Sequence, residues 1–290
     1  MNTLCIYHIA DNDGKGSAAI VKNLHPEASL FGLNHDMKIP VELIEKYDKI
    51  IVCDISLPLD YMFDLDTRKD FIWIDHHTSV IEPYEDALAT GEHKALKGLR
   101  RNGTAAIELT WEFFHPDKAI PEGVKLLSLN DIFDLRDERV RPFEYAFQSL
   151  GINMPDDPNW TKLFKNELNI NDMVEKGKAI LSWIRIRNYR SVRSMSFESE
   201  YMGLKCICAN MAYGYSEFYD SVENIHQYDF SINFYMNKQN KWNMTFYSLK
   251  PDIDVSKIAA TLGGGGHKGA AGASAQNKLP EFLTHGKSTF

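Results

Sequence analysis

Short apolar runs alternate with helix-like patterns over the first part of the chain. Each run has the length of a buried strand and ends at polar residues. The runs predict strands at Thr3–Tyr7, Ala28–Leu33, Lys49–Cys53 and Phe71–Ile74. Helical patterns begin at Ala18 and cover Val41–Tyr47 and Leu59–Leu65. Alternating strands and helices form right-handed crossovers, so we expect an α/β fold with a Rossmann-like, mostly parallel sheet.

The pattern changes after Pro155-Asp156-Asp157-Pro158, a sequence that breaks regular structure. A long amphipathic helix is predicted at Asp172–Tyr189. Strand-like runs follow at Tyr201–Ala209, Tyr228–Met236 and Trp242–Leu249, and then a short helix at Asp254–Ala260. We therefore expect an N-terminal domain over residues 1–155, a helical linker over residues 156–197 and a smaller α/β domain over residues 198–290.

Acids and histidines gather where the predicted N-terminal strands end. They are His8, Asp11 and Asp13 after the first strand, His35 after the second, Asp54 after the third, and Asp75, His76 and His77 after the fourth. Ligand sites in open α/β sheets lie at the carboxyl ends of the strands. Solvated loops, or an Asx turn with Ser17 as a helix cap, would explain part of this pattern. They do not explain its recurrence at successive strands.

Two further helices are predicted, Ala105–Phe114 with Thr104 as its cap and Val124–Leu129. Asp131 follows the second helix among apolar neighbours, which indicates a partly buried carboxylate that needs a partner. Oxygen and imidazole ligands without a thiolate favour Mn²⁺ or Mg²⁺ over structural zinc. These groups exceed the needs of one ion and suit a two-metal site with ions ~3.5–4 Å apart.

A run of four glycines, Gly263–Gly266, precedes His267 near the C-terminus. Glycine amides can face an anion, as they do in phosphate-binding loops. A flexible linker would continue in polar residues, whereas this run enters the small-residue segment Ala270–Ala275. The sequence therefore predicts an anion-binding loop at this position.

The net charge of −8 over 290 residues argues against a broad basic surface for long duplex nucleic acid. Acidity that serves only solubility explains the charge equally well. The cysteines at positions 5, 53, 206 and 208 lie in strand-like runs, where we expect reduced, packed thiols. No apolar run approaches the ~18 residues of a membrane span, and no signal-peptide pattern begins the chain. We therefore expect a cytoplasmic protein without a membrane partner.

The motifs together resemble the DHH/DHHA1 phosphoesterase superfamily, including its nanoRNase, oligoribonuclease-type and RecJ-like members. The matching residues are His8-x-x-Asp11-x-Asp13-Gly14, Asp54, Asp75-His76-His77, Asp131 and, in the C-terminal part, Gly264-Gly265-Gly266-His267 with Ala270-Ala271-Gly272. The resemblance covers nearly the whole chain. The triplet alone would be a weak signal, but the ordered combination is highly specific.

The resemblance implies a role for each residue. One metal would be held by His8, Asp11 and Asp54, and the other by Asp13, Asp54, His76 and Asp131. Asp75 would orient a neighbouring histidine, and His77 would face the substrate phosphate. Gly264, Gly265, Gly266, His267 and Lys250 would bind the substrate across an interdomain cleft. Lys250 stands where relatives often have arginine, and it lacks the bidentate fork of that residue.

The resemblance thus predicts a Mn²⁺-dependent phosphodiesterase that cleaves short oligonucleotides or dinucleotides to nucleoside monophosphates, with Mg²⁺ as an alternative ion. A RecJ-like single-strand exonuclease, or a hydrolase of cyclic dinucleotides or of 3′-phosphoadenosine 5′-phosphate, remains open. A catalytically inactive nucleotide-binding module is the alternative from a different class. Self-association as a homodimer also stays open.

Overall fold

The computed structural model describes residues 2–35, 37–152, 154–212, 216–266, 268–284 and 286–288. The chain divides into two compact units, Met1–Leu181 and Ser182–Phe290. The division falls within the long helix α9 (Ile170–Met195), inside the segment predicted to be a linker. The predicted limits at residues 155 and 197 remain an expectation.

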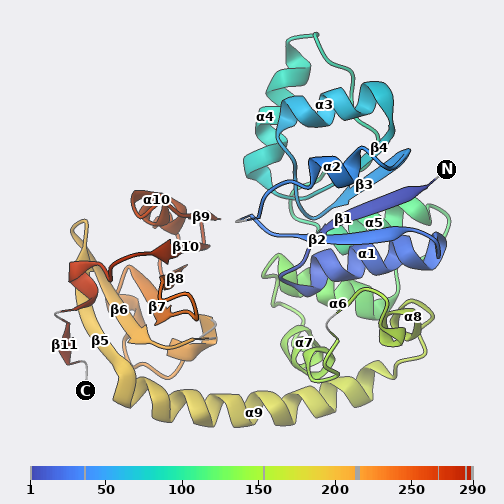
Figure 1. Cartoon of the computed structure of the whole chain (residues 1–290). Helices are drawn as coiled ribbons and strands as arrows, with labels where there is room; N and C mark the ends of the chain where they lie inside the picture. Colours follow the sequence, from blue (N-terminus) through green and yellow to red (C-terminus); the bar gives the residue numbers. More distant parts are fainter. Residues whose placement is uncertain are drawn as a thin grey trace. The chain divides into compact units, whose positions relative to one another are not determined.

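The first unit is built on a parallel sheet with the strand order β2-β1-β3-β4 (Figure 1). Its strands are β1 (Thr3–His8), β2 (Ser29–Leu33), β3 (Lys49–Cys53) and β4 (Asp70–Ile74). Every neighbouring pair is parallel, which confirms the predicted α/β fold with a parallel sheet. Parallel pairing brings the carboxyl ends of all these strands to one edge.

Helices cover both faces of this sheet (Figure 1). The helices of the unit are α1 (Asn12–Leu24), α2 (Val41–Ile44), α3 (Leu59–Arg68), α4 (Thr78–Ala89), α5 (Ala106–Phe114), α6 (Glu122–Asp131), α7 (Val140–Gln148) and α8 (Pro158–Phe164). Alternate strand residues such as Leu4 and Ile6 pack with α3 and α4. Their neighbours Cys5 and Tyr7 pack with α1 and α5 instead. Both faces of the sheet are buried, as expected when its strands are continuous apolar runs.

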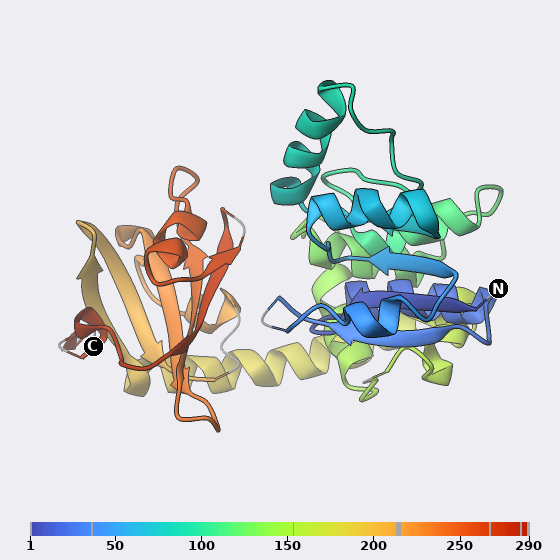
Figure 2. The ribbon, with the colours of Figure 1, turned by 45° about the horizontal axis from the view of Figure 1, so that its top comes forward.

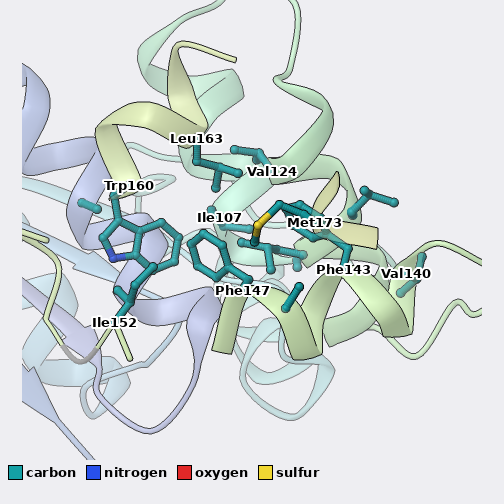
Figure 3. Close-up of a cluster of buried hydrophobic side chains, with 14 of the residues drawn as sticks. Ile107, Val124, Val140, Phe143, Phe147, Ile152, Trp160, Leu163 and Met173 are labelled. Atoms are coloured by element: carbon teal, nitrogen blue, oxygen red, sulfur yellow. The ribbon is translucent and has the colours of Figure 1, made fainter. Parts of the chain in front are cut away.

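A second core, formed mainly by helical residues, joins α1 and α5 to α6, α7 and α8 (Figure 3). Ile107 of α5, Val124 of α6 and Phe147 of α7 contribute to it, and the fully buried Trp160 of α8 packs edge-on against Phe147. This core fixes α6 in position, and α6 ends at Asp131. An apolar cluster thereby positions a carboxylate that lies far along the chain from the strand tips.

The structure corrects the predicted start of α1. The helix begins at Asn12 rather than Ala18, with Asp11 as its N-cap. Gly14 and Gly16 therefore lie inside the helix, not in a turn before it. A Cβ on Gly14 would lie 2.1 Å from the carbonyl oxygen of His8, and one on Gly16 would lie 2.3 Å from Ile107 Cδ1. Close packing, not turn geometry, explains these glycines.

The second unit contains a mixed sheet that, among the described residues, has the order β11-β5-β6-β7-β8-β10-β9 (Figure 2). Its elements are β5 (Ser196–Tyr201), β6 (Leu204–Asn210), β7 (Phe230–Met236), β8 (Trp242–Ser248), α10 (Val255–Thr261), β9 (Gly265–Gly266), β10 (Ala270–Gln276) and β11 (Lys287–Ser288). The strand-like run predicted at Tyr201–Ala209 contains the last residue of β5 and most of β6. Met202 and Gly203 both adopt positive φ and turn the chain between β5 and β6.

The cysteines behave as predicted. All four are free and buried. Cys206 and Cys208 point to one face of β6, where their Sγ atoms lie 3.6 Å apart within the apolar core. Ile207 points to the other face and packs with Val192 of α9. None of the described helices combines the length and the hydropathy needed to span a membrane.

Candidate metal centre

The first group of ligand atoms forms at the tips of β1 and β3. His8 Nδ1 lies 2.8 Å from Asp11 Oδ2 and 3.5 Å from Asp54 Oδ2. One ligand atom from each of these residues lies within 4.8 Å of the others. His8 ends β1, Asp11 caps α1, and Asp54 follows β3 directly. This is the set that the resemblance assigns to one metal.

The second group surrounds His76, two residues after β4. His76 Nε2 lies 3.5 Å from Asp13 Oδ2, 3.3 Å from Asp54 Oδ1 and 3.4 Å from Asp131 Oδ2. One ligand atom from each of Asp13, His76 and Asp131 also lies within 4.8 Å of the others. The structure thus brings all four residues of the second predicted set together.

Asp54 lies between the two groups and offers one carboxylate oxygen to each. Oδ2 faces His8 and Oδ1 faces His76. Its backbone is left-handed, with φ of 59°, and its amide donates to the carbonyl of Ile74 at 3.0 Å. Aspartate is among the few residues that tolerate this conformation. The turn places a buried carboxylate, 2% exposed, between the two groups of candidate ligands.

Asp13 has a second partner that the sequence did not reveal. Its Oδ2 accepts a hydrogen bond from Ala106 N at 2.8 Å, and its Oδ1 accepts one from Ile107 N at 2.6 Å. These are the first amides of α5, so Asp13 caps a helix that begins far along the chain. The prediction of Thr104 as the cap is wrong, because the N-cap position is Ala105, which makes no side-chain cap hydrogen bond.

Asp75 is fully buried, and its hydrogen bonds hold the triplet in place. Oδ1 accepts from the backbone amides of His76 and His77 at 2.7 and 3.1 Å and lies 2.7 Å from His77 Nδ1. Trp73 Nε1 donates to Oδ2 at 3.2 Å. Burial raises the pKa of Asp75, but the hydrogen bond and charge of His77 outweigh this effect, and the pKa is lowered overall. An ionised Asp75 fixes the proton of His77 on Nδ1 and leaves Nε2 for another partner.

The electrostatics of the cluster suit divalent cations. Burial raises the pKa of Asp54 well above its ordinary value, and the charges of Asp13 and Asp11 raise it further. Asp131, whose side chain is 24% exposed, has its pKa raised well above the ordinary value by burial and by Asp13. Burial lowers the pKa of His76, which keeps its imidazole neutral and able to bind metal. Carboxylates that repel one another in a buried site are stabilised by bound cations.

The predicted substrate residues lie in the second unit. Lys250 Nζ donates to Asp229 Oδ1 at 2.6 Å, so its charge is already paired. Gly265 and Gly266 pair with β10 as β9. A Cβ on Gly264 would lie 2.0 Å from the carbonyl oxygen of Gly272. Tight packing of this hairpin is thus one reason for the glycines. His267 lies outside the described residues, and the anion-binding role of the loop remains a prediction.

Two residues near the cluster had no predicted role. His35 follows β2, and its ring centroid lies 5.3 Å from that of His8, so it extends the line of strand-tip groups. Glu144 of α7 is buried and accepts from Asn12 Nδ2 at 2.9 Å, which holds the turn between Asp11 and Asp13. The position of His35 after a strand was a usable signal. Nothing local to Glu144 reveals its contact with α1.

Comparisons with known proteins identify the fold. No protein-family model matches the chain. Uncharacterized protein R106 of Acanthamoeba polyphaga mimivirus is 24% identical over 293 residues, covering 92% of this chain and 66% of that protein. The chain therefore spans just under two thirds of that relative's length.

Among solved structures, the pGpG-specific phosphodiesterase PggH of Vibrio cholerae matches with a TM-score of 0.50 and 12% identity, over 95% of this chain and 94% of that one. The chain has the fold of this phosphodiesterase. At 12% identity the match shows a shared fold. RecJ of Thermus thermophilus, solved with Mn²⁺, matches with a TM-score of 0.46 and 14% identity, over 97% of this chain and 50% of that one.

Proposed function

We propose that this protein is a divalent-metal-dependent phosphodiesterase that hydrolyses short oligonucleotides or linear dinucleotides to nucleoside monophosphates. The observation that carries the proposal is the position of Asp54, whose two oxygens face two separate ligand groups. This is the arrangement of a bridging carboxylate in a two-metal site. The shared fold supports the assignment, since the matched protein is named for hydrolysis of pGpG, a dinucleotide.

The ligand sets follow from the two groups. His8, Asp11 and Asp54 would hold one ion, and Asp13, Asp54, His76 and Asp131 the other. Mn²⁺ is the ion we expect, with Mg²⁺ as the alternative, because the donors are carboxylate oxygens and imidazole nitrogens. When bound, such ions supply Lewis-acid stabilisation of a phosphoryl oxygen and an activated water near neutral pH.

The residues of the chain supply orientation and a proton. Burial lowers the pKa of His77, but the hydrogen bond and charge of Asp75 outweigh it and raise the pKa overall. A protonated His77 would donate from Nε2 to a phosphoryl oxygen of the substrate. Gly264, Gly265, Gly266, His267 and Lys250 would contact the rest of the nucleotide, with Lys250 leaving Asp229 to do so.

An assay of several phosphate compounds tests this function. With Mn²⁺, we expect rapid hydrolysis of linear dinucleotides and trinucleotides, and slower hydrolysis of long RNA, cyclic dinucleotides, 3′-phosphoadenosine 5′-phosphate and pyrophosphate. EDTA should abolish every activity. Preference for long single strands would favour a RecJ-like exonuclease. Nucleotide binding without turnover in any metal would instead indicate an inactive binding module.

Asp75→Asn should lower kcat about 10- to 100-fold, the usual cost of removing the partner of a site histidine. The variant keeps the size of the side chain but replaces one acceptor oxygen with a donor, so His77 loses its fixed orientation. Mn²⁺ binding, measured by calorimetry, should keep the stoichiometry of the wild type. Loss of the ions themselves would show that Asp75 is a ligand and would contradict its role as the partner of His77.

A further inference from the structure

The second half of α9 is strongly basic in an otherwise acidic protein. Between Glu175 and Glu198 the chain contains no acidic residue, whereas the whole chain has a net charge of −8. The basic residues of this stretch are Lys176 and Lys178 in the first half of α9, and Arg185, Arg187, Arg190 and Arg193 in its second half. A local positive charge of this kind attracts a polyanion even when the whole protein is acidic.

Opposite faces of this part of α9 have different environments. Leu181, Asn188 and Val192 are buried, between 0% and 6% exposed. Large side chains at helical spacing point the other way, with Trp183 62%, Ile186 53% and Tyr189 48% exposed. Arg187, Arg190 and Arg193 recur on the same side at intervals of three residues, close to one turn. We refer to Trp183, Ile186, Arg187, Tyr189, Arg190 and Arg193 as the α9 face.

Arginines and aromatic rings are paired on the α9 face. The Arg187 guanidinium lies 5.6 Å from the centre of the Trp183 ring, and that of Arg193 lies 4.4 Å from the Tyr189 ring. Arg187 also donates to Asn188 Oδ1 at 3.0 Å, which holds it beside the indole. Exposed rings next to fixed cations offer stacking surfaces and phosphate contacts side by side.

Other occupants fit this surface less well. In a two-fold homodimer the same patch would face itself and bring its arginines together. In a membrane-surface helix the apolar face enters the lipid. On the α9 face the exposed Trp183, Ile186 and Tyr189 are interleaved with arginines, so no separate apolar face is left to enter the lipid. A single-stranded nucleic acid satisfies both the charge and the exposed rings.

We propose that the α9 face is a docking surface for single-stranded RNA or DNA. Trp183 and Tyr189 would stack on bases, and Arg187, Arg190 and Arg193 would contact phosphates. At 1.5 Å per residue, the helix from Trp183 to Arg193 is about 15 Å long, the length of about four stacked nucleotides. The proposal does not rest on the hydrolytic activity, and binding can be measured without it.

The test is fluorescence anisotropy of a labelled 12-nucleotide oligouridylate with the full chain in EDTA, where hydrolysis cannot occur. Trp183→Ala should weaken binding at least about fivefold, whereas Trp183→Phe should retain most of the affinity, because a ring remains for stacking. Arg187→Gln/Arg190→Gln should reduce the slope of log Kd against log salt by about 1.4. The control Arg136→Gln/Lys257→Gln changes two exposed cations elsewhere, at 90% and 82% exposure, and should change neither quantity.

Unchanged strand binding in both Trp183→Ala and Arg187→Gln/Arg190→Gln would overturn the proposal. It would equally be overturned if Trp183→Ala dissociated a homodimer in sedimentation, or if phosphatidylglycerol vesicles bound through Trp183 and the strand did not. Hydrolysis of a dinucleotide by Trp183→Ala with Mn²⁺ should equal that of the wild type. Absence of hydrolysis in every variant would count against the proposed function and would leave the docking result unaffected.

Discussion

Asp54→Asn is expected to reduce phosphodiester hydrolysis to the background rate while the fold remains intact. The substitution keeps the shape of the side chain but removes the charge and one of the two oxygens that face the separate ligand groups. Removing a hydrogen-bond partner of a metal ligand typically lowers activity about 10- to 100-fold. Removing a bridging ligand itself should therefore lower activity more than about 100-fold. Dinucleotide hydrolysis with Mn²⁺ gives the measurement. Asp60→Asn, the same change at an exposed site on α3, is the control.

A second measurement separates metal binding from catalysis. Because burial raises the pKa of Asp54 well above its ordinary value, its ionised form destabilises the folded state above that pKa when no cation is bound. Asp54→Asn should therefore melt at or above the wild-type temperature in EDTA. With free ion at a hundredfold excess over its Kd, the wild type should gain about 2.7 kcal/mol, and the variant much less. Equal stabilisation of both proteins by Mn²⁺ would refute the bridging role.

The strand tips were predictable because their pattern is local. Continuous apolar runs specify buried parallel strands, and parallel strands end at one edge of the sheet. His8, Asp54 and His76 therefore had to meet near that edge, even though the sequence gives no distances. The structure adds that the two oxygens of Asp54 face different groups. That detail depends on the left-handed backbone at Asp54, which no pattern of apolar residues specifies.

Other features depend on contacts that are distant in the sequence. Two glycines in α1 lower its helical propensity, so its start was placed too late. They are tolerated because α1 packs closely against His8 and Ile107. The partner of Lys250 lies 21 residues earlier on another segment, which a search for phosphate-binding cations does not reveal. Helical propensity and residue spacing do not predict features that depend on tertiary packing.

Asp13 caps α5 and also belongs to a candidate ligand group. Asp13→Ala should therefore lower the free energy of unfolding and abolish hydrolysis. Both carboxylate oxygens accept hydrogen bonds from buried amides at the start of α5. Removing the acceptors leaves those amides without partners, at about 1–3 kcal/mol each. Removing the charge also relieves repulsion with Asp54, which works in the opposite direction. A comparison of Asp13→Ala with Asp13→Asn separates the two effects, because both variants lose the charge.

Asp13→Asn retains one oxygen that can accept from α5, so it should unfold at higher denaturant concentration than Asp13→Ala. We expect a difference of about 1–3 kcal/mol in the free energy of unfolding in EDTA. Both variants should fail to hydrolyse dinucleotides. His76→Ala should also be inactive but should keep the α5 contacts, since His76 makes its close contacts with ligand side chains. Equal stability of the alanine and asparagine variants would mean that the α5 amides find other partners, and Asp13 would then act only as a ligand.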